Sequence, residues 1–259
     1  MDELAIEVVS GLVVGLGMGL VGAGGAIFTV PVFGTLLGHA PKSAIVEALA
    51  VTGVIAAASG AAAAIRGLVD WRRVAIFGVT GFIGAQLAAP VAVRLSGTVQ
   101  LLMFVAVALV AAWRMWRSAA GAASTAPADH DPRRALLKSA GVGLGIGALT
   151  SMLGVGGGFI LIPALVMLER LPMRNAVATS LVVISVNAAA GLLGQWWSGG
   201  FDVIDFAGRP VAIVAACGVA GSFVGAAVAS RVPQAALRRV FAALLAMVTL
   251  GMLLSSAAR

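Results

Sequence analysis

Long apolar runs separated by short charged stretches dominate the chain. They fall into two sets of four, at residues 5–38, 43–65, 74–93 and 98–113, then 139–168, 175–197, 210–229 and 235–256. Most approach or exceed the roughly 20 residues with which a helix crosses a hydrocarbon core of about 30 Å. Their apolar character is continuous rather than alternating, which favours spanning helices over strands. The pattern therefore predicts an all-α integral membrane protein.

An internal repeat relates the two sets of runs. At an offset of 132 residues, 22–31 (GAGGAIFTVP) aligns with 154–163 (GVGGGFILIP), and Asp70 aligns with Asp202. A five-residue insertion after Asp202 then moves the offset to 137. The predicted organisation is a first repeat at 1–117, a cytoplasmic linker at 118–138 and a second repeat at 139–259.

The first run of each half is too long for one span and too short for two. We therefore expect a re-entrant hairpin of two short helical arms, broken at the glycines. With one hairpin and three spanning helices in each half, all but four of the 17 Lys and Arg residues lie on one side, whereas eight spanning runs would divide them almost evenly. The exceptions are Lys42, Arg94, Arg209 and Arg259.

Because basic residues concentrate on the cytoplasmic side, this division favours the hairpin interpretation. An odd number of spans in each half makes the two halves inverted repeats. Both termini are predicted to lie outside and the linker in the cytoplasm. The first ten residues carry acids and no basic residue, so the first run is expected to belong to the mature protein.

Composition excludes several other classes of protein. With 61% hydrophobic and 10% charged residues, the chain lies far from soluble composition. The net charge of +7 arises from short loop clusters, which argues against nucleic-acid binding. The histidines, His39 and His130, lie outside the predicted spans, leaving no base for a nucleophile and no metal-ligand cluster. We therefore expect no enzyme activity and no cofactor, and the single cysteine, Cys217, is expected to be a small buried apolar group.

Glycines supply two different signals. A GxGxxG pattern at Gly17, Gly19 and Gly22 lacks the strand and the acidic residue of a dinucleotide site. We assign these glycines to close helix packing, because Gly11, Gly15 and Gly19 stand at four-residue spacing and Gly143 and Gly147 repeat it. The glycines at the hairpin breaks leave N–H groups unpaired at the start of a second arm, where a helix N-terminus favours an anion. They are Gly24, Gly25, Gly156, Gly157 and Gly158. The alternative is a tight turn that binds nothing.

Polar residues within the apolar runs complete the candidate substrate site. Asn187 and Gln86 are the costliest to bury and should face either a helix partner or a polar pathway. The other candidates are the hydroxyl-bearing residues Thr29, Thr52, Ser151, Thr179 and Ser180.

Three acids within or beside the runs receive separate predictions. Glu47 lies well inside a run, where it could carry a proton in coupling or simply pair with Lys42 near the interface. Asp70 and Asp202 are expected to cap the helices that follow them.

The duplicated Gly-x-Gly-Gly-(Gly/Ala)-x4-Pro element, together with Ala178-Thr-Ser-Leu181, resembles the sulfite exporter TauE/SafE family of membrane transporters. The resemblance covers nearly the whole chain except the linker and the extreme ends. It implies a transporter of the bacterial plasma (inner) membrane for small sulfur-containing anions such as sulfite or organosulfonates. The first half departs from the family pattern with Ala26 in place of a third glycine and with Glu47 at the position equivalent to Thr179.

We accordingly expect a secondary transporter, working as an exporter, in which an anion binds between two arm N-termini and the hydroxyls of Thr179 and Ser180. Rocking of the two halves would give alternating access. Two alternatives stay open, a passive anion channel on the same scaffold and a non-transporting membrane scaffold subunit. The expected partners are a small anion and the lipid bilayer, with homo-oligomer formation left open.

Overall fold

The computed structural model describes residues 3–22, 28–96, 132–153, 158–167, 169, 171–199 and 206–233, with separate residues within 99–113 and 236–243. All the regular elements among these residues are helices. They are α1 (Glu3–Val21), α2 (Thr29–Pro31), the π-helical η2 (Val32–Leu36), α3 (Pro41–Ile65), α4 (Trp71–Arg94), α6 (Pro132–Leu153), α7 (Gly158–Met167), α8 (Met173–Trp197) and α9 (Gly208–Ala229).

Six of these helices are long and apolar enough to cross a membrane, namely α1, α3, α4, α6, α8 and α9. The prediction of an all-α integral membrane protein is confirmed. Local chemistry explains several helix ends. Pro41 begins α3, where its missing N–H costs nothing, and Gly67 follows the helix with a φ of +69°, which glycine adopts without strain.

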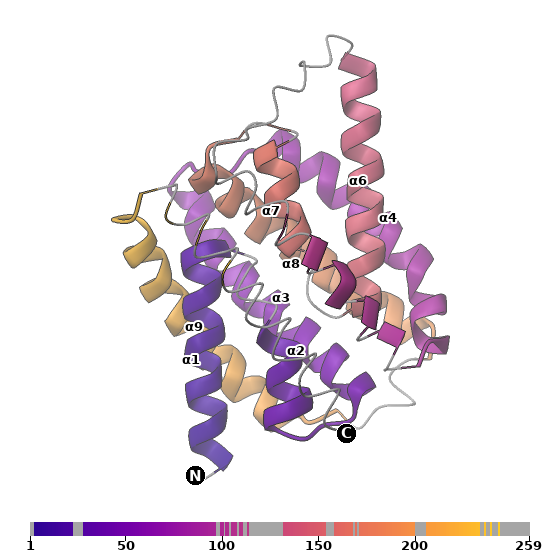
Figure 1. The fold of residues 1–259 in the computed structure, drawn as a ribbon, viewed down its shortest axis with the longest axis vertical. Helices are drawn as coiled ribbons and strands as arrows, with labels where there is room; N and C mark the ends of the chain where they lie inside the picture. The colour runs from indigo at the N-terminus through magenta and orange to yellow at the C-terminus, as the bar shows by residue number, and fades with distance from the viewer. Residues whose placement is uncertain are drawn as a thin grey trace.

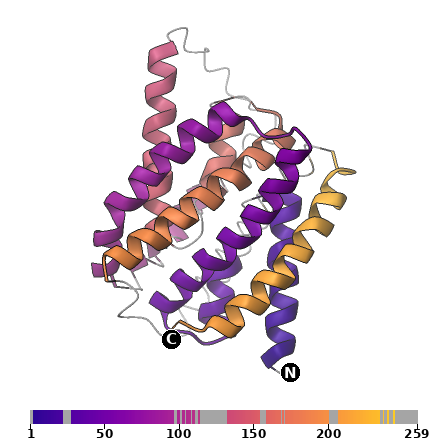
Figure 2. The ribbon, with the colours of Figure 1, turned by 180° about the vertical axis from the view of Figure 1, so that it is seen from behind.

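Four tilted helices lie side by side in one layer, in the order α4, α8, α3 and α9 (Figure 2). At one edge α6 packs against α4, and at the other α1 packs against α9 (Figure 1). The short helices α2 and α7 lie on the opposite face, against α3 and α8 respectively. The central pair, α3 and α8, is one place where the two halves meet. It carries five of the polar candidate residues, Glu47, Thr52, Thr179, Ser180 and Asn187.

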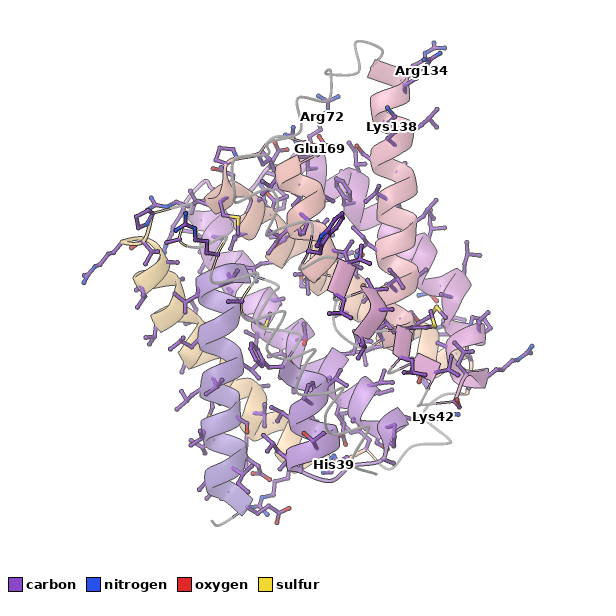
Figure 3. All side chains as sticks on the ribbon, in the orientation of Figure 1. His39, Lys42, Arg72, Arg134, Lys138 and Glu169 are labelled. Carbon is purple, nitrogen blue, oxygen red and sulfur yellow. The ribbon has the colours of Figure 1, made fainter. Side chains whose placement is uncertain are left out.

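Each first run folds back on itself. Helix α1 begins at the end of the molecule that carries His39 and Lys42, whereas Arg134 and Glu169, which flank the α6 to α7 segment, both lie at the opposite end (Figures 1 and 3). The first arms are longer than expected, because α1 has 19 residues and α6 has 22, against 10 in α7. The expectation of two short arms is wrong in this respect, since the apolar sequence before each glycine segment continues as one helix without an interruption.

Close helix contacts occur in matching pairs in the two halves. A Cβ added to Gly15 of α1 would overlap the backbone of Gly218 in α9, and one added to Gly147 of α6 would overlap the backbone of Gly81 in α4. These pairs are related by the offsets of 132 and 137 residues found in the sequence. Small residues that let helix backbones approach are typical of membrane interfaces. The packing role predicted for the spaced glycines is confirmed at these positions, and Cys217 lies half-buried against Gly11 in the same α1 to α9 interface.

One pairing within the repeat is wrong. Asp70 is the N-cap residue of α4, and its side chain accepts a hydrogen bond from the backbone N of Arg73 at 3.1 Å, as predicted. The N-cap residue of α9 is Ala207 rather than Asp202, which lies outside the described residues. The five-residue insertion therefore precedes the cap, and Ala207 is the structural equivalent of Asp70.

Candidate functional site

The glycine segments themselves lie largely outside the described residues. This applies to Gly24, Gly25, Gly156 and Gly157, whereas Gly158 is the first residue of α7. Their predicted anion-binding role stays a prediction. The polar residues next to these segments are described, and they show which parts of the two halves meet there.

Two candidate threonines meet beside the first glycine segment. Thr29 begins α2 and Thr52 lies in the middle of α3, and both side chains are fully buried. The Thr52 Oγ1 donates to Thr29 Oγ1 at 3.4 Å. This long contact fixes the returning arm against α3 within the first half.

The Thr179 and Ser180 pair of α8 faces two separate surroundings. The Thr179 Oγ1 accepts a hydrogen bond from the backbone N of Asp70 at 3.0 Å. Ser180 donates to the carbonyl oxygen of Val177 at 2.8 Å and lies beside Gly22, where an added Cβ would be 3.3 Å from the Ser180 Oγ. Ser180 therefore meets the first glycine segment, whereas Thr179 is occupied by the start of α4. The two hydroxyls thus have different neighbours, and their joint binding of an anion stays a prediction.

Asn187 stands out among the buried polar groups. Its side chain is fully buried on α8, and neither its amide nitrogen nor its amide oxygen has a hydrogen-bond partner. It lies against Gly81 of α4, just as Ile55 of α3 lies against Gly218 of α9 at the equivalent position of the other half. An amide thus occupies a position where the repeat has a branched apolar side chain.

Ser151 lies in the last turn of α6 before the second glycine segment, against the turn of α8 that follows Asn187. Its hydroxyl is fully buried and also lacks a partner. One turn beyond Asn187, a Cβ added to Gly191 would be 3.6 Å from the Ser151 Cα. Because most buried polar atoms in proteins are hydrogen-bonded, two unpaired groups at one helix junction indicate a place for water or a polar ligand.

Two glutamines border this junction and are hydrogen-bonded to backbone. Gln86 of α4 donates through Nε2 to the carbonyl oxygen of Ala190 at 2.9 Å. Gln195 of α8 donates to the carbonyl oxygen of Ser151 at 3.2 Å. Gln86 therefore holds α4 against α8, which is the helix-packing alternative left open for it by the sequence.

Glu47 is fully buried in the first half of α3 and does not pair with Lys42. Its Oε2 lies 2.5 Å from the Nδ1 of His39, and its Oε1 accepts from the backbone N of Ala207 at 2.9 Å. The Lys42 Nζ instead donates to the carbonyl oxygen of Val93 at 3.0 Å. The alternative of a Lys42 to Glu47 pair is therefore wrong, because Lys42 reaches the end of α4.

A second polar cluster lies at the other end of the molecule. The Arg73 Nε donates to Glu169 Oε2 at 3.0 Å, and the same guanidinium pairs with Asp70. Ser139 of α6 donates to the other oxygen of Glu169. Burial acts to raise the pKa of Asp70, but the hydrogen bonds and charge of Arg73 outweigh burial and hold this pKa below its ordinary value.

The sequence did not predict either of the two polar clusters, which lie at opposite ends of the molecule. Arg73 and Glu169 are 96 residues apart in the sequence, and for His39 the sequence predicts only a position outside the spans. One signal was available, since charged residues at both ends of a re-entrant run must lie at the same end of the molecule. Figure 3 shows Arg72, Lys138 and Glu169 at one end and His39 and Lys42 at the other.

A cavity of about 170 Å³ lies between α1, α3, α8 and α9. Its walls are mainly apolar, and Arg66, Arg174 and the hydrogen-bonded Ser59 and Ser222 contribute polar groups. None of the predicted site residues that the structure describes lines it. Over the part of the chain that the structure describes, no three His, Cys, Asp or Glu side chains gather in a way that could hold a metal ion.

The long apolar helices and the buried polar side chains between the two halves define a multi-pass membrane protein with polar groups in its interior. Comparison with known proteins identifies its family. The model of the family described as "Sulfite exporter TauE/SafE" matches residues 8–252. The chain belongs to this family, as its duplicated glycine element predicted, and it is a membrane transporter.

Curated relatives agree with this assignment. A probable membrane transporter protein from Xylella fastidiosa strain Temecula1 is 30% identical over 245 residues, covering 93% of this chain and 91% of that protein. A protein of the same description from strain 9a5c is 30% identical over 231 residues, covering 89% of this chain and 86% of that protein. No solved structure matches the chain.

Proposed function

We propose that this protein is a secondary transporter that exports a small sulfur-containing anion, such as sulfite or an organosulfonate, across the bacterial inner membrane. The family name supports the class of substrate. The observation on which the site rests is Asn187, a fully buried amide with no partner at a position where the other half has Ile55. Burying an unpaired amide costs about 1–3 kcal/mol, so a polar species that binds there would recover that cost.

The chemistry of this junction fits an oxyanion. The Asn187 amide and the Ser151 hydroxyl can each donate a hydrogen bond to sulfonate or sulfite oxygens, and neither adds a fixed charge. Ser151 lies two residues before Leu153, where α6 ends next to the second glycine segment. N–H groups from that segment would supply further donors in the manner of other discontinuous-helix transporters.

The repeat also supports alternating access. Contacts between the halves recur in matched pairs, and inverted repeats provide two equivalent ways of packing the same elements. In this proposal the end with Arg72, Lys138 and Glu169 faces the cytoplasm, where basic residues collect. The cavity with Arg66 and Arg174 lies between elements that approach this end and would attract anions from that side.

The test uses purified protein in proteoliposomes with sulfite, sulfoacetate, thiosulfate, taurine and sulfate. We expect saturable counterflow and thermal stabilisation by at least one of the first three anions, with Asn187→Ile losing tenfold or more of both. Gln100→Leu is the control, because Gln100 is a buried amide elsewhere in the chain whose Nε2 donates to the carbonyl oxygen of Ala92, although its Oε1 has no partner.

Each other outcome has a defined meaning. Flux that does not saturate and shows no counterflow would support the channel alternative. Neither flux nor stabilisation with any anion, in protein that retains its fold, would favour a scaffold role. Equal losses in the Asn187 and Gln100 variants would argue against the proposed site.

A further inference from the structure

Two equivalent hydrogen bonds join the halves near opposite ends of the molecule. The backbone N of Ala207, which caps α9, donates to the Glu47 Oε1 at 2.9 Å. The backbone N of Asp70, which caps α4, donates to the Thr179 Oγ1 at 3.0 Å. Glu47 and Thr179 are 132 residues apart and the two cap residues 137, so one bond is the repeat of the other. Each half therefore presents a side chain to the start of a helix in the other half.

The chemistry of the two acceptors differs. Thr179 offers a hydroxyl, which does not titrate in the physiological range. Glu47 offers a carboxyl group that is fully buried, and its second oxygen lies 2.5 Å from the Nδ1 of His39. The His39 side chain is 19% exposed, and its ring lies 5.7 Å from that of Phe33. A titratable pair that reaches from solvent to a buried carboxyl thus exists at one of the two equivalent contacts.

Among the described residues, no charged side chain other than His39 pairs with Glu47. Lys42, on the same helix, is directed to the carbonyl oxygen of Val93. Among the neighbouring elements, α1 carries Glu3 and Glu7 near its start, α4 carries Arg94 as its last residue and α9 carries Arg209 as its second residue. Helix α2 and η2 contribute no titratable group. His39 is the one described side chain that forms an ion pair with Glu47.

We propose that His39 and Glu47 form the proton-binding site through which a proton gradient drives transport. A proton from water at the exposed face binds the His39 imidazole and passes from Nδ1 to the Glu47 Oε2 along the 2.5 Å contact. The neutral carboxyl is a weaker acceptor for the Ala207 N–H than the carboxylate. Protonation therefore releases the start of α9 from α3 and allows this end to open.

The proposal rests on the proposed transport function. It predicts that protonation affects the Glu47 contact and not the equivalent Thr179 contact. The Thr179 contact has the same geometry with an acceptor that does not titrate, so protonation can weaken the acceptor only at the Glu47 contact. Glu47→Thr copies the Thr179 arrangement and keeps an acceptor for Ala207. Glu47→Gln keeps size and acceptor but removes the charge, so both variants separate titration from packing.

The first experiment measures two kinds of transport in the same proteoliposomes, namely accumulation driven by a pH gradient and counterflow. In wild-type protein a gradient of one pH unit should accumulate substrate up to about tenfold for each coupled proton. Both Glu47 variants should lose this accumulation while keeping counterflow, which needs no net proton movement. Accumulation driven equally well in wild type and variants would overturn the coupling role.

The second experiment does not depend on a known substrate. Spin labels at Arg94→Cys and Arg209→Cys, in a Cys217→Ala background, report the separation of α4 and α9 at this end. We expect the distance distribution to shift between pH 8.5 and 5.5, and Glu47→Thr to abolish the shift. A wild-type distance distribution that does not change with pH would refute the proton site even if transport is confirmed. A pH shift without transport would instead point to failure of the proposed function.

Discussion

At the scale of single residues, the repeat provides an internal comparison for each unusual side chain. Asn187 and Ile55 occupy equivalent places against Gly81 and Gly218, yet one is an unpaired amide and the other an aliphatic side chain. Helix packing needs only the aliphatic group, as Ile55 demonstrates. The amide therefore carries a cost in stability that packing does not explain.

This cost predicts opposite effects on stability and function. Asn187→Ile should raise the thermal unfolding temperature in detergent, because it removes an unpaired buried amide worth about 1–3 kcal/mol. The same change should abolish stabilisation by substrate anions. Differential scanning fluorimetry with and without anion measures both effects. A lower unfolding temperature without anion would mean that the amide has a structural partner, contrary to its assignment.

At the scale of elements, backbone contact between glycines determines which helices pair. Gly147 of α6 faces the backbone of Gly81, whereas Gly145, two residues earlier on the same helix, has open space around its Cβ position. The equivalent contact of α1 with α9 uses Gly15 and Gly218. Van der Waals packing of small residues drives helix association within lipid, so these contacts carry much of the arrangement.

A pair of alanine substitutions on α6 tests this role. Gly147→Ala should lower the unfolding temperature, because its Cβ would overlap the backbone of Gly81 and overpacking costs about 1–3 kcal/mol. Gly145→Ala should leave the temperature unchanged or raise it, since alanine favours helix by up to about 1 kcal/mol. Thermal unfolding of both variants in one detergent gives the comparison, and equal destabilisation would contradict the contact assignment.

The positions of elements were predictable from sequence, whereas their partners were not. The apolar runs 43–65, 74–93, 175–197 and 210–229 agree with α3, α4, α8 and α9 to within three residues at each end. Charged residues and turn residues next to each run mark where it begins and ends. The contacts of Glu47 with His39 and of Thr179 with Asp70 depend on how the halves meet, which hydropathy alone does not encode. Asp202 failed as a cap because a loop insertion changes the register without changing the helices.

At the scale of the whole molecule, the two halves exchange equivalent contacts. Lys42 reaches the carbonyl oxygen of Val93, and Arg174 reaches that of Ser230, at the offsets of 132 and 137 residues. Lys42 lies at the end with His39, whereas Arg174 begins the helix that follows Glu169 at the other end (Figure 3). Equivalent residues at opposite ends are what an inverted repeat requires of a membrane-spanning chain.

Cysteine accessibility in a membrane tests this arrangement directly. In a Cys217→Ala background, Lys42→Cys should react with an impermeant maleimide added outside intact cells. Arg174→Cys should react only after the membrane is opened, because the end rich in basic residues is expected to face the cytoplasm. Arg72→Cys is the matched control, since Arg72 is labelled at the end with Glu169 and should behave like Arg174 (Figure 3). Labelling of Lys42→Cys and Arg174→Cys from the same side would refute inverted repeats, and with them the alternating-access mechanism that relies on two equivalent ends.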